Sequence, residues 1–262
     1  MKRIFLLLSP ILLFAKVHYA KVEPIESITL KSAVSAQVTQ AKIELEGRTV
    51  FGTIIRLDDK LDREKLKSSK ESLALVKSMI SINQKILIAL KESLKLQKAY
   101  YSKMQTIASA SKSQKDNSFY AYTNAKTQYL STKEKIDNLK KQKLNLEFEI
   151  ARLKDSISKK NIIVNKRFLY KLLVHKGDFV NMGTPLAQLK NLTSAKLVLF
   201  LEEDELKDIK KRKIYIDDKA TNYKINKIWK VTDEKFISSY RSEIIIKAPE
   251  DNFSTLLKVE LR

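Results

Sequence analysis

The residue types that most often carry enzyme chemistry are scarce in this chain of 262 residues. Cysteine is absent, and the two histidines, His18 and His175, have no second histidine at a metal-ligand spacing and no Ser/His/Asp set around them. The sequence therefore predicts no catalytic residue, no metal site and no cofactor. We expect a protein that is not an enzyme and that acts through its surfaces.

A duplicated turn pattern is the first group of residues whose spacing is informative. Residues 46–53 and 176–184 differ by one inserted residue, and together they use all four glycines of the chain. Such internal similarity indicates a repeated structural unit. The expected turn positions are Gly47, Val50, Gly52, Gly177, Val180 and Gly183.

A short polar stretch at residues 108–118 is the second group. It lacks large apolar side chains and lies between two long helical patterns, which predicts that it forms the tip of a helical hairpin. Its polar residues include Ser111, Gln114, Asp116 and Ser118.

The elements on either side of this tip are predicted to be long helices. No glycine or proline occurs between Gly52 and Gly177, and apolar residues recur every seven positions in both arms, which is typical of a left-handed coiled coil. We therefore expect an antiparallel coiled-coil hairpin at residues 59–160. The predicted seam rows begin at Leu66 and Ser69 in the first arm and at Tyr122 and Ala125 in the second.

Short strands are predicted on both sides of the hairpin. Alternating apolar residues at 28–57 and 162–174 indicate half-buried strands around the two turn copies. Residues 21–58 and 161–191 are thus two halves of one β domain, because neither half could bury its apolar face alone. Residues 192–262 show several short strands and a helical pattern at 202–210, which predicts a small β-barrel.

The N-terminus resembles a secretory signal. A basic start is followed by an apolar run at residues 4–15 and a small residue, Ala20, before a polar sequence. We expect a signal peptide at residues 1–20 that is either cleaved or retained as an inner-membrane anchor; no cysteine is present to carry a lipid. Export would make nucleic acid an unsuitable partner, so the net charge of +21 indicates another anionic partner or a solvated surface.

The order of these parts resembles the HlyD-type periplasmic adaptors, also called membrane fusion proteins. The resemblance rests on the first Gly/Val half-motif, the long hairpin, the second half-motif at residues 177–189, and the barrel. It implies an α+β fold in which a coiled-coil hairpin is inserted into a lipoyl-like (biotinyl-like) β domain that carries no lipoyl group. A small β-barrel domain follows.

The tip is similar to that of RND efflux adaptors, whose hairpin turn carries a Ser-x-x-Glu/Gln-x-Asp-x-Ala pattern where it meets the outer-membrane duct. Ser111, Gln114, Asp116 and Ser118 stand in those positions, so the resemblance implies that they are the contact residues. Tyr100 and Met104 stand where that group often has arginine and leucine. The resemblance implies a subunit for transmembrane transport, in the periplasm at the inner membrane. It would bridge an inner-membrane efflux pump and a TolC-like outer-membrane duct, as a homo-oligomer. The RND type is favoured, and an ABC transporter is the alternative pump.

The chain ends with the predicted barrel at Arg262, so we expect the barrel and the lipoyl-like domain to face the pump. The rival interpretation is a coiled-coil scaffold of the cell envelope without a transport role. It accounts for the heptads, but not for the duplicated half-motif. The transported substrate, the pump type, the oligomer number and cleavage of the signal are left open by the residues alone.

Overall fold

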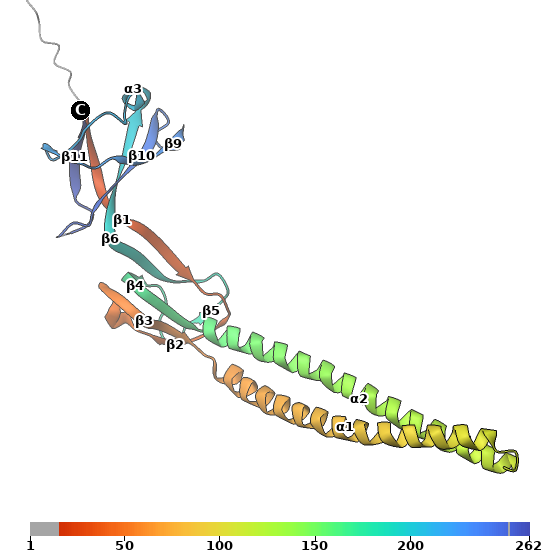
Figure 1. Cartoon of the computed structure of the whole chain (residues 1–262). Coiled ribbons are helices and arrows are strands. Elements are labelled where there is room, and N and C mark those ends of the chain that lie inside the picture. The colour runs from red at the N-terminus through yellow and green to blue at the C-terminus, as the bar shows by residue number, and fades with distance from the viewer. Residues whose placement is uncertain (1–15, 251) are drawn as a thin grey trace, which may run out of the picture. The chain divides into compact units, whose positions relative to one another are not determined.

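The computed structural model describes residues 16–250 and 252–262, so most of the expected signal peptide lies outside the described residues. The chain forms two compact units. The β-rich unit contains the chain up to Ser32, Val38–Ile55 and Ile163–Arg262, and the helical unit contains Ala33–Gln37 and Arg56–Ile162. Figure 1 shows the elements of both units.

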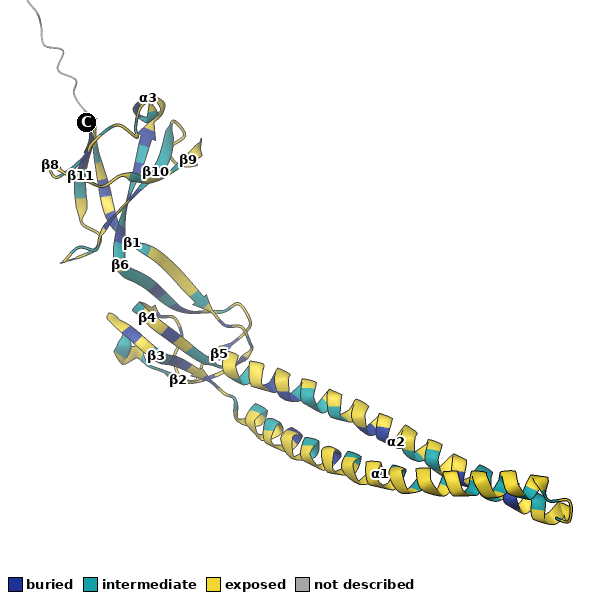
Figure 2. Cartoon of the chain, viewed as in Figure 1, coloured by how far each residue is buried: buried dark blue, intermediate teal, exposed yellow. Residues whose placement is uncertain are grey.

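The helical unit is a two-helix hairpin made of α1 (Lys60–Thr106) and α2 (Lys112–Lys159). Cross-helix contacts show the antiparallel direction: Lys65 near the start of α1 pairs with Glu149 near the end of α2. The buried residues of both helices follow the predicted heptad rows, with Ser118 one heptad before Ala125, and the other residues are half-buried or exposed (Figure 2). These buried residues are Ser69, Val76, Asn83, Ser118, Ala125, Ile136, Leu139, Ile150 and Leu153.

Two polar groups of α1 lie at its contact with α2, and the second of them links the two helices. Asn83 is buried in the seam, where its side chain donates a hydrogen bond to the Met79 carbonyl oxygen (2.8 Å). At the base, Asp62 of α1 accepts a hydrogen bond from Ser156 (2.9 Å) and pairs with Lys160 (3.0 Å). Burial acts to raise the pKa of Asp62, but the bonds from Lys160 and Ser156 outweigh it and hold the pKa below its ordinary value.

The lipoyl-like part of the β-rich unit joins segments from before and after the hairpin. Its strands occur in the order β5-β2-β3-β4-β6-β1. Because β3 and β4 are neighbours in the sheet but lie on either side of the hairpin in sequence, the hairpin is an insertion in this β domain. The bounds are β1 Val17–Lys31, β2 Ala36–Ala41, a 3₁₀ turn at Ile43–Leu45, β3 Arg48–Leu57, β4 Asn161–Leu172, β5 Phe179–Val180 and β6 Pro185–Glu202.

The two turn copies exchange hydrogen bonds between the halves. Gly47 N–H donates to the Leu169 carbonyl oxygen (2.8 Å), and Gly177 N–H donates to the Val38 carbonyl oxygen (2.9 Å). Both glycines have positive φ, 74° and 101°, a backbone conformation that residues with a Cβ atom adopt at a cost. Each copy thus closes onto the opposite half of the domain.

Val50 and Val180 are both buried, at 5% and 1% exposure. The valine of each turn copy therefore points into the core. Their burial explains why each copy carries a valine between its glycines, since the turn must return an apolar side chain to the interior.

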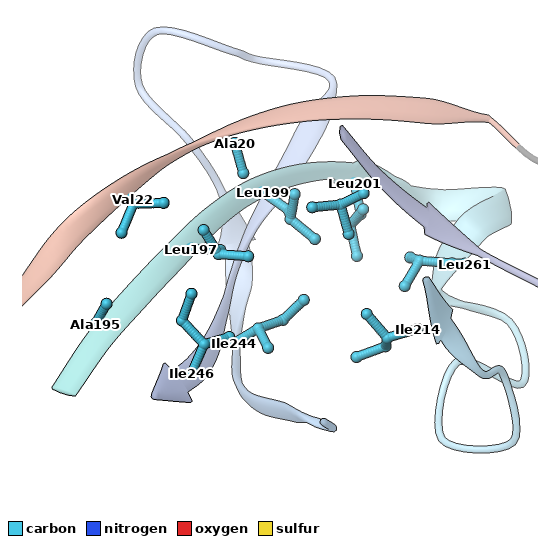
Figure 3. Close-up of a cluster of buried hydrophobic side chains, with 11 residues drawn as sticks. Ala20, Val22, Ala195, Leu197, Leu199, Leu201, Ile214, Ile244, Ile246 and Leu261 are labelled. Atoms are coloured by element: carbon cyan, nitrogen blue, oxygen red, sulfur yellow. The ribbon is translucent and has the colours of Figure 1, made fainter. Parts of the chain in front are cut away.

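The barrel part contains the later half of β6 and the elements that follow it. The bounds are α3 Glu203–Leu206, β7 Ile214–Ile216, β8 Lys219–Ala220, β9 Ile225–Thr232, β10 Ser239–Lys247 and β11 Leu256–Leu261. Its core gathers side chains from β1, β6, β7, β10 and β11 (Figure 3). The fold class predicted from the sequence is confirmed: a helical hairpin combined with a strand-rich sheet.

Two expectations about local structure need correction. Strand β1 begins at Val17, within the expected signal peptide, and pairs with β11 from Val17 to Lys21. Ala20 is part of the barrel core and His18 Nε2 lies 2.6 Å from Glu205 Oε1, so cleavage after Ala20 would remove a paired strand end. The helix expected at 202–210 is limited to the four residues of α3, because Lys207 is already extended (ψ 125°) and Asp208 follows with a positive φ of 57°.

Candidate contact site at the tip of the hairpin

The tip is a tight turn between two helix ends. Helix α1 ends at Thr106, Ile107 is extended, and α2 begins at Lys112, so the turn is shorter than the predicted 108–118. Inside the turn, Ala110 N–H donates to the Ile107 carbonyl oxygen (3.3 Å). The start of α2 therefore presents the polar residues that the sequence singled out.

Ser111 and Gln114 form a capping box at the start of α2. Gln114 N–H donates to Ser111 Oγ (3.2 Å), and Ser111 N–H donates to Gln114 Oε1 (2.8 Å). A cap of this kind stabilises a helix by about 0.5–2 kcal/mol. These two side chains thus hold the start of the helix, while both remain exposed.

Ser118 and Asp116 have opposite environments. Ser118 is 2% exposed at a seam position, and its hydroxyl donates to the Lys115 carbonyl oxygen (2.7 Å). It is therefore a packing residue, and its burial removes it from the expected contact surface. Asp116 is exposed and provides a negative charge in the first turns of α2.

Aromatic residues just below the turn were not identified as site residues from the sequence. Tyr101 of α1 stacks on Tyr122 of α2, with ring centroids 5.5 Å apart, and also contacts Phe119 (5.7 Å). Phe119 and Tyr120 are 45% and 63% exposed, although they directly follow a buried seam residue. The sequence did contain a signal for Phe119 and Tyr120, because both positions lie outside the two seam rows and should therefore be exposed. Exposed aromatic side chains of this type commonly anchor protein interfaces.

We define the tip surface as Ser111, Gln114, Asp116, Phe119 and Tyr120. It combines exposed hydrogen-bonding groups, one carboxylate and two aromatic rings within less than three turns of α2. Such a mixture suits recognition of another protein rather than chemistry. Among residues 16–250 and 252–262, no group of three or more acidic or histidine side chains is placed to hold a metal ion.

A second surface lies on the outer side of α1. Leu75, Met79, Ile82 and Ile86, which we call the α1 stripe, are 43% to 67% exposed. Their spacing of four, three and four residues repeats the heptad pattern at positions that α2 does not cover. Among the described helices, α1 alone is long and apolar enough, by length and composition, to cross a membrane. Of its most apolar 18-residue stretch, 11% is buried.

The chain was compared with known proteins. Neither a protein-family model nor a curated protein sequence matches it. Among solved structures, MacA from Actinobacillus actinomycetemcomitans matches with a TM-score of 0.71 and 17% identity, covering 95% of this chain and 79% of MacA.

Two further structures match over similar lengths. The membrane fusion protein Spr0693 from Streptococcus pneumoniae R6 has a TM-score of 0.64 at 9% identity, covering 95% of this chain and 99% of Spr0693. A MacA-MexA chimera that contains the Pseudomonas aeruginosa MexA α-hairpin domain has a TM-score of 0.59 at 15% identity, covering 94% of this chain and 78% of the chimera. The resemblance seen in the sequence is thus confirmed at the level of the fold, and the chain has the fold of the HlyD-type membrane fusion, or periplasmic adaptor, proteins.

Proposed function

We propose that this chain is the periplasmic adaptor of a tripartite efflux or export system. The observation that carries the proposal is the tip surface, held at the end of a hairpin whose helices contain 47 and 48 residues. At 1.5 Å per residue each helix is about 70 Å long, so the hairpin holds the tip surface about 70 Å from its own base. The role is mechanical, and no side chain performs a reaction.

Two partners are part of the proposal, one for the tip surface and one for the β-rich unit. The tip surface docks on a TolC-like outer-membrane duct, while the lipoyl-like and barrel parts face an inner-membrane pump. The partial match of Ser111, Gln114 and Asp116 to RND adaptors favours an RND pump, and an ABC transporter is the alternative. The protein works in the periplasm, associated with the inner membrane, and is exported by its N-terminal segment.

Site-directed crosslinking tests the tip contact. The chain has no cysteine, so a single cysteine can be placed at Asp116 and another, as a control, at the exposed mid-rod residue Lys141. We expect Asp116→Cys to crosslink to an outer-membrane protein in cells that transport, and Lys141→Cys not to do so. Equal crosslinking of both positions, or none from Asp116→Cys, would favour the envelope-scaffold interpretation.

Self-association through the α1 stripe is part of the proposal. The heptad spacing of the stripe fits a helix of a second copy, which would cross α1 at a small angle. Residues 78–84 in its centre contain no charged side chain, so two copies would meet there without charge repulsion despite the high net charge. Burying four such side chains would supply apolar area that the single hairpin leaves exposed.

The double substitution Ile82→Lys/Ile86→Lys is expected to weaken self-association by about tenfold or more, because it places charges in an apolar contact. Sedimentation analysis measures the oligomeric state. Both side chains are exposed in the single chain, so the melting temperature of the monomer should change little. The matched control Lys91→Glu/Lys98→Glu alters exposed charges elsewhere on α1. An unchanged oligomer in the stripe variant would contradict this interface.

A further inference from the structure

The barrel contains a pocket at an opening in its sheet. Strand β9 pairs with β10, while β7 pairs with β11 and β8; β7 and β9 are not neighbours among the described strands. The gap between them is bordered by the loop that precedes β7 and by the first residues of β9. A cavity of about 440 Å³ lies there, which is within the range of about 300–1,000 Å³ for small-molecule sites. We call it the barrel pocket.

The wall of the barrel pocket is apolar and belongs to the core. It is formed by Ile209, Ile214, Ile225 and Ile228. Ile214 is 2% exposed within the core cluster, and Ile209 and Ile225 are partly buried against that cluster. An apolar group that entered the pocket would therefore contact side chains already held in place by the barrel core.

The rim of the barrel pocket is basic. Lys210, Arg212, Lys224 and Lys227 line it together with Asn226, and no acidic residue does. Lys227 lies over the Trp229 ring, 4.2 Å from its centroid. For Lys210, Arg212 and Lys224 the described part of the chain provides no ion pair, because the nearby Asp208 is paired with Lys211.

Charge and shape together define the ligand. Cations without carboxylate partners attract an anion and repel a cation, and an isoleucine wall favours a hydrocarbon chain. We propose that the barrel pocket binds an amphipathic organic anion, with its apolar chain against the isoleucines and its carboxylate or phosphate group held by Lys210, Arg212 and Lys224. This site stands on the barrel alone and is independent of the duct contact.

Calorimetric titration of the purified full chain tests the site. The probe is dodecanoate below its micelle concentration, compared with dodecyltrimethylammonium, which has the same chain and the opposite charge, and with inorganic phosphate, which has no chain. We expect saturable binding of dodecanoate, and binding at least about tenfold weaker for the other two probes, because each lacks one of the two interactions.

A charge-neutralising variant locates the site. Arg212→Gln/Lys224→Gln should weaken dodecanoate binding by about tenfold or more, since bonds to charged groups are lost at the rim. The matched control Lys219→Gln/Lys230→Gln removes two exposed lysines of β8 and β9 that do not line the pocket, and should bind as the wild type does. Equal binding of dodecanoate and dodecyltrimethylammonium, unsaturable binding, or wild-type affinity in the rim variant would overturn the proposal.

Discussion

Replacing Ile136 with Asp is expected to destabilise the hairpin by about 3–5 kcal/mol. Ile136 is 3% exposed in the seam of α2, so the substitution loses an apolar burial of about 1.5–3 kcal/mol and adds the cost of an unpaired charge. Urea unfolding followed by the helical circular dichroism signal measures the change in the free energy of unfolding.

The matched control for this experiment is Leu144→Asp on the same helix. Leu144 is 63% exposed, so the same chemical change should cost less than about 0.5 kcal/mol there. Equal effects of the two substitutions would mean that Ile136 is not a seam residue in solution.

Substituting the tip surface is expected to abolish transport while leaving the hairpin folded. In Asp116→Arg/Tyr120→Ala, the exposed carboxylate is reversed and an exposed aromatic ring is removed, so a docking interface would lose both a charge and an anchor. We expect transport to fall by about tenfold or more in a strain that has no other adaptor for the same pump. Efflux of a fluorescent substrate and the melting temperature are measured together.

The control for the tip is Lys141→Glu, a charge reversal at an exposed mid-rod position, which should transport normally. Ser111 is unsuitable for this test because its loss would also remove the helix cap. Normal transport by the tip variant would remove the mechanistic basis of the adaptor proposal. Lost transport with a lowered melting temperature would indicate damage to the hairpin rather than to an interface.

Local periodicity determined much of this fold. The seam positions of both helices were predictable because a seven-residue apolar repeat places the same face of each helix against its partner, and Val76, Ile136 and Leu153 are buried as expected. The turn copies were also predictable, since Gly47 and Gly177 occupy positive-φ positions that favour glycine. These features depend on residues close together in sequence.

Helix phase and local capping decided which polar side chains of the tip remain available. Ser111, Gln114, Asp116 and Ser118 share one polar segment, but the helix phase buries Ser118 and the capping box occupies Ser111 and Gln114. A composition pattern does not specify which of several polar groups will find a local partner.

Pairing between strands distant in sequence decided where β1 begins and where the barrel pocket lies. The start of β1 at Val17 depends on β11, more than two hundred residues later, and the barrel pocket depends on the gap between β7 and β9. Residues 17–20 fit the end of a signal segment by sequence, and only their pairing with the distant strand β11 shows that they belong to a strand. The sequence by itself thus determined the helices and the turns, whereas the tertiary structure determined exposure, strand ends and cavities, because these depend on partners distant in the chain.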